Sequence, residues 1–199
     1  MHRLNPRDVL RELGSAVVYV SVEDSNSDSS IGSAFHIGEG WFATARHVVE
    51  NKKILRIGRL DITLQERVDA SGNRHRQTIY PEFASSEVSK ISFYPDEQID
   101  LAVFHCAAFT GPTIYLDLTT DRIAWNEFLL QEVLVLGYPP IPFAKDPFLV
   151  CVRAEVSAVI EHYSVGRRHF VVSGIPRGGF SRSRAAVPAG LAFRIDEKR

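Results

Sequence analysis

The chain begins with a helical pattern that soon changes to the pattern of β-strands. Residues 5–13 (NPRDVLREL) predict one short helix, with Asn5 as its N-cap and Pro6 at the first helical position. Gly14 follows the last turn, where glycine is common after helices. The sequence therefore predicts a helix that ends before the first strand.

β-branched and aromatic residues dominate the next segments. Residues 16–23 (AVVYVSVE) predict a strand, and the polar residues 24–32 (DSNSDSSIG) predict a turn. Residues 33–45 (SAFHIGEGWFATA) predict two strands joined at Gly38–Gly40. This is the pattern of a β-hairpin.

Similar short segments continue along the chain, separated by turn residues at the spacing of barrels and sandwiches. They cover residues 52–58, 61–68, 76–83, 89–95, 99–106, 132–139, 148–164 and 167–174. Residues 73–76 (NRHR) predict an exposed hairpin turn, and His36 and His105 are predicted strand positions. The sequence thus predicts two successive all-β halves, residues 1–107 and 125–199, with residues 108–124 as a connector.

Composition and charge limit the class of protein. The 199 residues are 45% hydrophobic, enough for real cores, and the formal net charge of −1 favours neither nucleic acid nor an anionic membrane as a partner. The charged N-terminus lacks the apolar core of about 7–15 residues that a secretory signal needs. No window reaches the roughly 18 apolar residues of a spanning helix. A cytoplasmic location is therefore expected.

Cysteine and histidine spacing indicates neither a disulfide framework nor a metal site. Cys106 and Cys151 are too few for either, and both are predicted to be buried free thiols. His162 and His169 have poor spacing for a metal pair. Arginines gather toward the C-terminus without a recognised nucleic-acid-binding motif, which favours a solvated basic face. No metal and no cofactor are expected.

His47, in the stretch WFATARHVV, is the first candidate for chemistry, because histidine exchanges protons near neutral pH. A histidine that acts as general base needs an acidic residue on one ring nitrogen and a nucleophile on the other. Asp100 stands at the edge of an apolar strand, where it can be partly desolvated. Ser181 lies in the segment RGGFS, where glycines permit a turn that aims the amides of Gly179 and Ser181 at one point. In isolation, a histidine such as His47 is more often structural or exposed than catalytic, and the Ser181 segment fits a surface loop better. Asp100 alone fits a strand end or turn equally well.

Taken together, these stretches resemble the trypsin-like (chymotrypsin-fold) serine proteases, especially their bacterial members. GSAFHIGEGWFATARHVV is similar to that family's strand, turn, strand and T-A-x-H motif, and IDLAVF is similar to its D-[IL]-A-[LV] segment. LGYP resembles a turn of the second barrel in bacterial members, and RGGFS resembles the start of the G-x-S-G-G loop. The resemblance covers roughly residues 14–181.

The resemblance implies an all-β fold of two antiparallel β-barrels and a catalytic triad. His47 would be the general base, Asp100 its orienting acid and Ser181 the nucleophile, with the oxyanion hole at Gly179 and Ser181. Ile175 corresponds to the base of the specificity pocket, and an apolar residue there argues against a preference for Lys or Arg. A polypeptide is the implied substrate.

The C-terminal region departs from the family pattern. Residues 182–184 are Arg, Ser and Arg, where the family has two glycines and often a proline. After them only residues 190–195 (GLAFRI) fit a strand, so the second barrel is expected to be incomplete. Two hypotheses follow, namely a serine endopeptidase and a catalytically impaired protease-fold module that binds peptides or protein partners.

Overall fold

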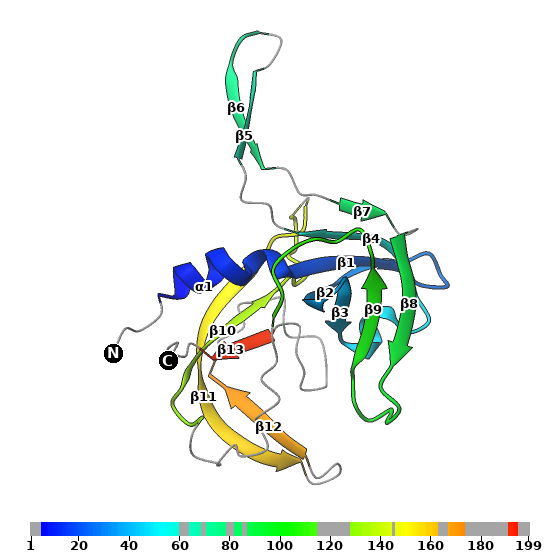
Figure 1. Ribbon diagram of the computed structural model, residues 1–199, viewed down its shortest axis with the longest axis vertical. Coiled ribbons are helices and arrows are strands. Elements are labelled where there is room, and N and C mark those ends of the chain that lie inside the picture. Colours follow the sequence, from blue (N-terminus) through cyan, green and yellow to red (C-terminus); the bar gives the residue numbers. More distant parts are fainter. Residues whose placement is uncertain are drawn as a thin grey trace.

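The computed structural model describes residues 5–59, 64–68, 71–78, 82–84, 87–114, 128–144, 146–162, 167–173 and 191–194. Within these ranges the chain is mainly β-structure, with one helix at the N-terminal end and a helical turn after the third strand (Figure 1). The predicted all-β class and the short N-terminal helix are both confirmed.

The helix α1 (Pro6–Leu13) forms where the sequence predicts it. The side chain of its N-cap, Asn5, accepts a hydrogen bond from the Arg7 amide at 3.0 Å, and Pro6 occupies the first turn, where a missing N–H costs nothing. Val9 is its buried residue. The short 3₁₀ helix η1 (Gly14–Ala16) then leads directly into the first strand.

The larger sheet has seven strands in the order β7-β4-β1-β2-β3-β9-β8, and it is curled into a half-barrel (Figure 1). The pairings between its neighbouring strands are all antiparallel. The strands are β1 (Val17–Glu23), β2 (Ser29–Gly38), β3 (Trp41–Thr44), β4 (Lys53–Arg59), β7 (Glu82–Ala84), β8 (Val88–Phe93) and β9 (Ala102–Cys106).

Strand β1 is buried on both faces, which explains why its sequence is almost continuously apolar. Val18, Val20 and Val22 belong to the core inside the curled sheet, together with Phe42 and Phe104, whose rings stack at 5.2 Å. The alternate residues of β1 belong to a second cluster on the opposite face. A strand covered on both faces loses the alternation of polar and apolar residues.

The smaller sheet has four strands in the order β12-β11-β10-β13. They are β10 (Glu132–Gly137), β11 (Val150–His162), β12 (Arg167–Val172) and β13 (Leu191–Arg194). A small apolar cluster lies on this sheet, formed by Val133, Ala154, Val156 and Val159. The expected incompleteness of the second barrel stays a prediction, because residues 174–190 lie outside the described residues.

The two sheets meet across the outer face of β1. Val17 and Tyr19 pack there with Leu136 of β10 and with Tyr138, whose ring lies edge-on to that of Tyr19 at 5.6 Å. The Tyr138 amide also donates a hydrogen bond of 2.7 Å to the Ser33 hydroxyl on β2. The junction between the sheets is therefore both apolar and hydrogen-bonded.

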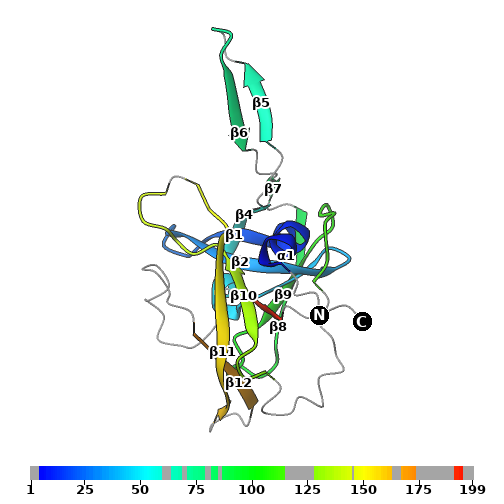
Figure 2. The same ribbon diagram turned by 90° about the vertical axis from the view of Figure 1, so that its left-hand side faces the viewer.

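The hairpin of β5 (Leu64–Val68) and β6 (Arg74–Thr78) projects away from both larger sheets (Figures 1 and 2). Residues 73–76 were predicted as its turn, but residues 74–76 belong to β6, where Arg74 pairs with Val68. The prediction is therefore wrong for three of its four residues. The turn lies instead at residues 71–73, where Gly72 has a φ of 80°. Glycine adopts this left-handed conformation without steric cost.

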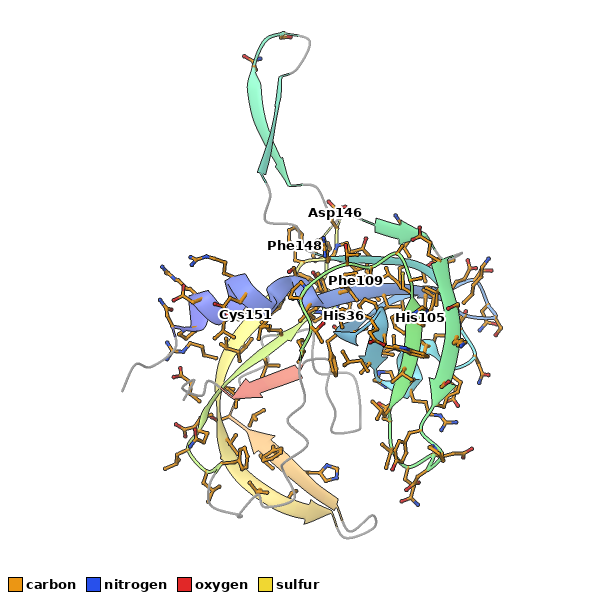
Figure 3. All side chains as sticks on the ribbon, in the orientation of Figure 1. His36, His105, Phe109, Asp146, Phe148 and Cys151 are labelled. Atoms are coloured by element: carbon orange, nitrogen blue, oxygen red, sulfur yellow. The ribbon has the colours of Figure 1, made fainter. Side chains whose placement is uncertain are left out.

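Two further predictions need correction. β2 begins at Ser29, inside the polar segment predicted as a turn, because its first residues pair with Glu23 and Val22 while their side chains stay exposed. Both cysteines are free thiols, but only Cys106 is buried, and burial raises the pKa of its thiol. Cys151 is exposed, because it lies in the outward-facing set of alternate residues of β11 (Figure 3).

The Ser33→Ala substitution tests the junction between the two sheets. It removes the acceptor of the partly buried Tyr138 amide, so we expect the free energy of unfolding to fall by about 1–3 kcal/mol. Guanidinium denaturation measures the change. Ser30→Ala, an exposed position of the same strand, is the control and should change stability by less than about 0.5 kcal/mol. Equal effects of the two substitutions would contradict this account of the junction.

Candidate active site

The helical turn α2 (Arg46–Val49) carries the first candidate residue, His47. It follows β3 directly, and its Val48 and Val49 are buried in the core inside the curled sheet. Because consecutive helical residues point in different directions, burying the two valines turns His47 toward the surface. Arg46, three residues before Val49 and on the same face of the turn, stays only partly exposed. The His47 side chain is 62% exposed.

Gly32 on β2 permits the close packing of α2. A Cβ atom at this position would lie 2.5 Å from a methyl group of Val48, which is too short for a real contact. Thr44 anchors the end of β3 beside it, because its hydroxyl donates a hydrogen bond of 2.8 Å to the Ser33 carbonyl. Gly32 was predicted to end the polar turn of residues 24–32, so its place in a strand, where an isolated glycine indicates a close approach, was missed.

Asp100 lies next to His47 and contacts it at two points. Its Oδ1 accepts a hydrogen bond from the His47 amide at 2.9 Å, and its Oδ2 lies 2.6 Å from the ring Nδ1. The N-cap residue of α2, Ala45, has no side-chain oxygen for the amides of the first turn. Asp100 therefore caps this turn from a segment that is distant in sequence.

The contact with Asp100 also orients the imidazole and selects Nδ1 as the donor to the carboxylate. An ionised carboxylate accepts hydrogen bonds and cannot donate them, so Nδ1 of His47 carries the proton at this contact. Nε2 then holds the lone pair, on the opposite side of the ring. A neutral imidazole held in this way is oriented to accept a proton from another group.

The connection between β8 and β9 carries Asp100. Its ends are joined by a hydrogen bond from the Tyr94 amide to the Leu101 carbonyl, at 3.0 Å. Within it the Ile99 amide donates to the Asp96 carbonyl, also at 3.0 Å. Asp100 lies near the start of β9, as predicted, but the apolar segment after it is buried only in part, because Leu101 is exposed while Ala102 and Phe104 are buried.

His36 has a different environment and a structural role. Its side chain is buried between the rings of Phe42 and Phe109, at centroid distances of 5.3 and 4.7 Å (Figure 3). Nδ1 donates to the Pro112 carbonyl at 2.9 Å, and Nε2 accepts from the Gly40 amide at 3.1 Å. Both ring nitrogens are hydrogen-bonded to the backbone, so His36 links the β2–β3 turn to residues 109–114. Neither nitrogen is available for catalysis.

Arg46, directly before His47, was also missed by the sequence analysis. Its Nε donates to Glu50 at 2.8 Å, and its guanidinium lies 5.1 Å from the centre of the Phe93 ring. Its Nη1 lies 3.4 Å from the Tyr94 carbonyl, and Nη2 lies 3.9 Å from the carboxylate of Glu97. No local signal indicates these contacts, because three of the four partners belong to a distant segment.

The structure brings together two of the predicted site residues, His47 and Asp100. Ser181, Gly179 and Ile175 lie outside the described residues. Among the residues that the structure describes, no group of three metal-ligating side chains could hold an ion. In the same part of the chain, no helix has the length and apolar composition needed to cross a bilayer.

No protein-family model and no curated protein matches the sequence, but solved structures match the fold. A variant of the HtrA-type protease AlgW with a tripeptide superposes with a TM-score of 0.51 and 17% sequence identity, over 84% of this chain and 45% of that one. Deg5 superposes with a TM-score of 0.52 and 18% identity, over 94% of this chain and 78% of that one.

These comparisons confirm the predicted trypsin-like fold and the resemblance to bacterial trypsin-like serine proteases at the level of the fold. The chain spans less than half the length of the AlgW chain. At these identities the likeness concerns the course of the chain and not its activity.

Replacing Asp100 by alanine tests the two-point contact. Asp100→Ala removes the acceptor of the His47 amide, so we expect this amide to exchange with solvent at least about tenfold faster. Hydrogen exchange followed by NMR measures the rate. Asp96→Ala is the control, because Asp96 lies in the same connection and bonds the Gln98 amide. Unchanged exchange of His47 in Asp100→Ala would show that the carboxylate does not cap α2.

Proposed function

We propose that this chain is a serine endopeptidase of trypsin-like fold that cleaves peptide bonds through an acyl-enzyme. In this proposal Ser181 is the nucleophile, His47 the general base and Asp100 the residue that orients His47. The reaction needs no cofactor, because the nucleophile, the base and the oxyanion donors all come from the protein.

The observation that carries the proposal is the two-point contact of Asp100 with His47. The 2.6 Å contact at Nδ1 fixes the tautomer, and the 2.9 Å bond to the amide fixes the carboxylate relative to the ring. A structural histidine such as His36 has protein partners on both nitrogens. His47 instead has an acid on one nitrogen and a side chain that is 62% exposed.

The proposed reaction starts when the Ser181 oxygen attacks the carbonyl carbon of the scissile peptide bond. The hydroxyl proton passes to Nε2 of His47, and Asp100 stabilises the imidazolium that forms. The imidazolium then gives this proton to the leaving amine as the C–N bond breaks, which leaves an acyl group on Ser181. Water, deprotonated by His47, attacks the ester and releases the second product and the free hydroxyl.

The oxyanion that forms at the carbonyl would be held by the amides of Gly179 and Ser181. Donors that are in place before the reaction stabilise this charge without reorganisation. Ile175 would lie at the base of the primary specificity pocket, where an apolar side chain favours uncharged substrate residues over Lys or Arg. The substrate is a polypeptide in this proposal.

One observation favours a second candidate function. Arg182, Ser183 and Arg184 stand where active members of the resembled family have small residues after the nucleophile. A large side chain at position 182 can strain the turn or obstruct the site. The second candidate is therefore a protease-fold module that binds peptides or protein partners without cleaving them.

A fluorophosphonate probe, which reacts only with activated serines, separates the two functions. We expect the wild-type protein to be labelled and both Ser181→Ala and His47→Ala to take up no label. For peptide cleavage, removing Ser181 or His47 should lower kcat by about 10⁴-fold or more, since the triad acts as one unit. Intact-mass spectrometry measures the labelling.

Ser183→Ala is the matched control, because it removes a neighbouring hydroxyl and should leave labelling unchanged. Loss of label in Ser183→Ala instead of Ser181→Ala would reassign the nucleophile. A folded wild-type protein that takes up no label would contradict the endopeptidase and favour the binding module.

A further inference from the structure

The connection that carries Asp100 has little apolar burial of its own. Residues 94–98 are exposed, and Phe93 and Leu101 at its ends are exposed by 39% and 36%. Segments of this kind open locally at low free-energy cost. The contact between Asp100 and His47 does not change this, because both side chains reach solvent, with exposures of 32% and 62%. Even with His47 protonated, an exposed ion pair would contribute only about 0–1 kcal/mol.

Arg46 anchors the first half of the connection through its side chain, in addition to the hydrogen bond that joins the ends at Tyr94 and Leu101. Its side chain is only 16% exposed, the lowest value among the ionic side chains of this region. Burial strengthens its charge-assisted hydrogen bonds and its attraction to the Phe93 ring, because less solvent competes for the guanidinium. The ionic contact with Glu50, four residues later on the same turn, holds the guanidinium in place.

The contacts of Arg46 lie at the opposite end of the connection from Asp100. Phe93 is the last residue of β8, Tyr94 and Glu97 lie in the first half of the connection, and Asp100 is its last residue but one. α2 therefore holds the connection at two places, through Arg46 at the first half and through the backbone and ring of His47 near the end. With the first place lost, the hydrogen bond from the Tyr94 amide to the Leu101 carbonyl and the exposed Asp100 contact remain to hold the connection.

We propose that Arg46 is a positioning residue that holds the Asp100 carboxylate against His47. It touches neither the ring nor the carboxylate, and it acts by fixing the segment from which Asp100 projects. Its consequence for catalysis rests on the proposed endopeptidase function, whereas its consequence for the geometry of His47 does not. A lysine would be a poor substitute, because it lacks the planar fork that reaches several partners at once.

NMR of the Arg46→Gln variant tests this role without requiring activity. We expect the His47 amide, which bonds Oδ1 of Asp100, to exchange about tenfold faster than in the wild type. The far-downfield signal of the proton between Nδ1 and Oδ2 should broaden or disappear. For an active enzyme, kcat should fall about tenfold or more while KM stays unchanged, because Arg46 acts on the base and not on substrate binding.

Arg59→Gln is the matched control. Arg59 also lies 5.1 Å from the centre of an aromatic ring, Phe109, and donates to a distant main-chain carbonyl, that of Thr110, at 3.0 Å. It is remote from the contact between His47 and Asp100, so its loss should lower stability and leave both His47 signals unchanged. Equal changes in the two variants would indicate general loosening and would overturn the proposal.

The proposal would also be overturned if the Arg46→Gln variant kept both the slow exchange of the His47 amide and the downfield signal. If Arg46→Gln does not fold, Phe93→Leu replaces it, because this exposed position loses only the ring beneath the guanidinium. It should produce the same changes at His47 to a smaller extent, and their absence would overturn the proposal. If the wild type takes up no fluorophosphonate but Arg46→Gln still loses both signals, the positioning role stands and the endopeptidase function fails.

Discussion

The packing of α2 against β2 is the constraint on which the candidate site depends. Val48 and Val49 belong to the apolar core of the curled sheet, and Val48 can pack there only because Gly32 has no side chain in its path. Once the valines are buried, the side chain of His47 must face outward. The position of His47 is thus set by the core beneath it, and the polar contacts only refine the orientation of its ring.

The two histidines near this core illustrate what burial and hydrogen bonding do to the same side chain. His36 is buried and both of its nitrogens have protein partners, so its role is to link the β2–β3 turn to residues 109–114 by hydrogen bonds. His47 lies at the surface with an acid on one nitrogen. Among the described residues the two imidazoles thus differ in their partners, and the proposed role of His47 as a base rests on this difference.

Much of the fold could be predicted from the sequence, because helix caps and β-branched runs are local signals. Asn5 and Pro6 predicted the start of α1, and the β-branched and aromatic run of residues 16–23 predicted the strand β1. The proximity of His47 and Asp100 was predicted because their two motifs resemble those of the trypsin-like serine proteases and occur in the same order. The role of Ser181 stays a prediction, since that residue lies outside the described residues.

The features that the sequence did not reveal depend on contacts between distant segments. β2 begins in a polar run because strand pairing satisfies its backbone, which requires no apolar side chain. Cys151 is exposed because it belongs to the set of alternate residues of β11 that faces solvent. The sequence around Cys151 does not show which of the two sets faces solvent, because Val150, Cys151 and Val152 are all apolar. The contacts of Arg46 with Phe93 and Glu97 exist because the chain around the β8–β9 connection lies beside α2, and no local pattern in the sequence indicates this.

The projecting hairpin of β5 and β6 marks a position where the length of the chain can change without disturbing the larger sheet. β4 and β7, which flank it in sequence, already pair with each other through Ile57 and Phe83, so the excursion leaves and re-enters the sheet at neighbouring points. Lengthening a closed excursion costs only about 0.6 kcal/mol for each doubling, and a lone two-stranded ribbon adds little stability of its own. Insertions, deletions or a grafted recognition element at this point would leave the curled sheet, and the histidine at its end, unaltered.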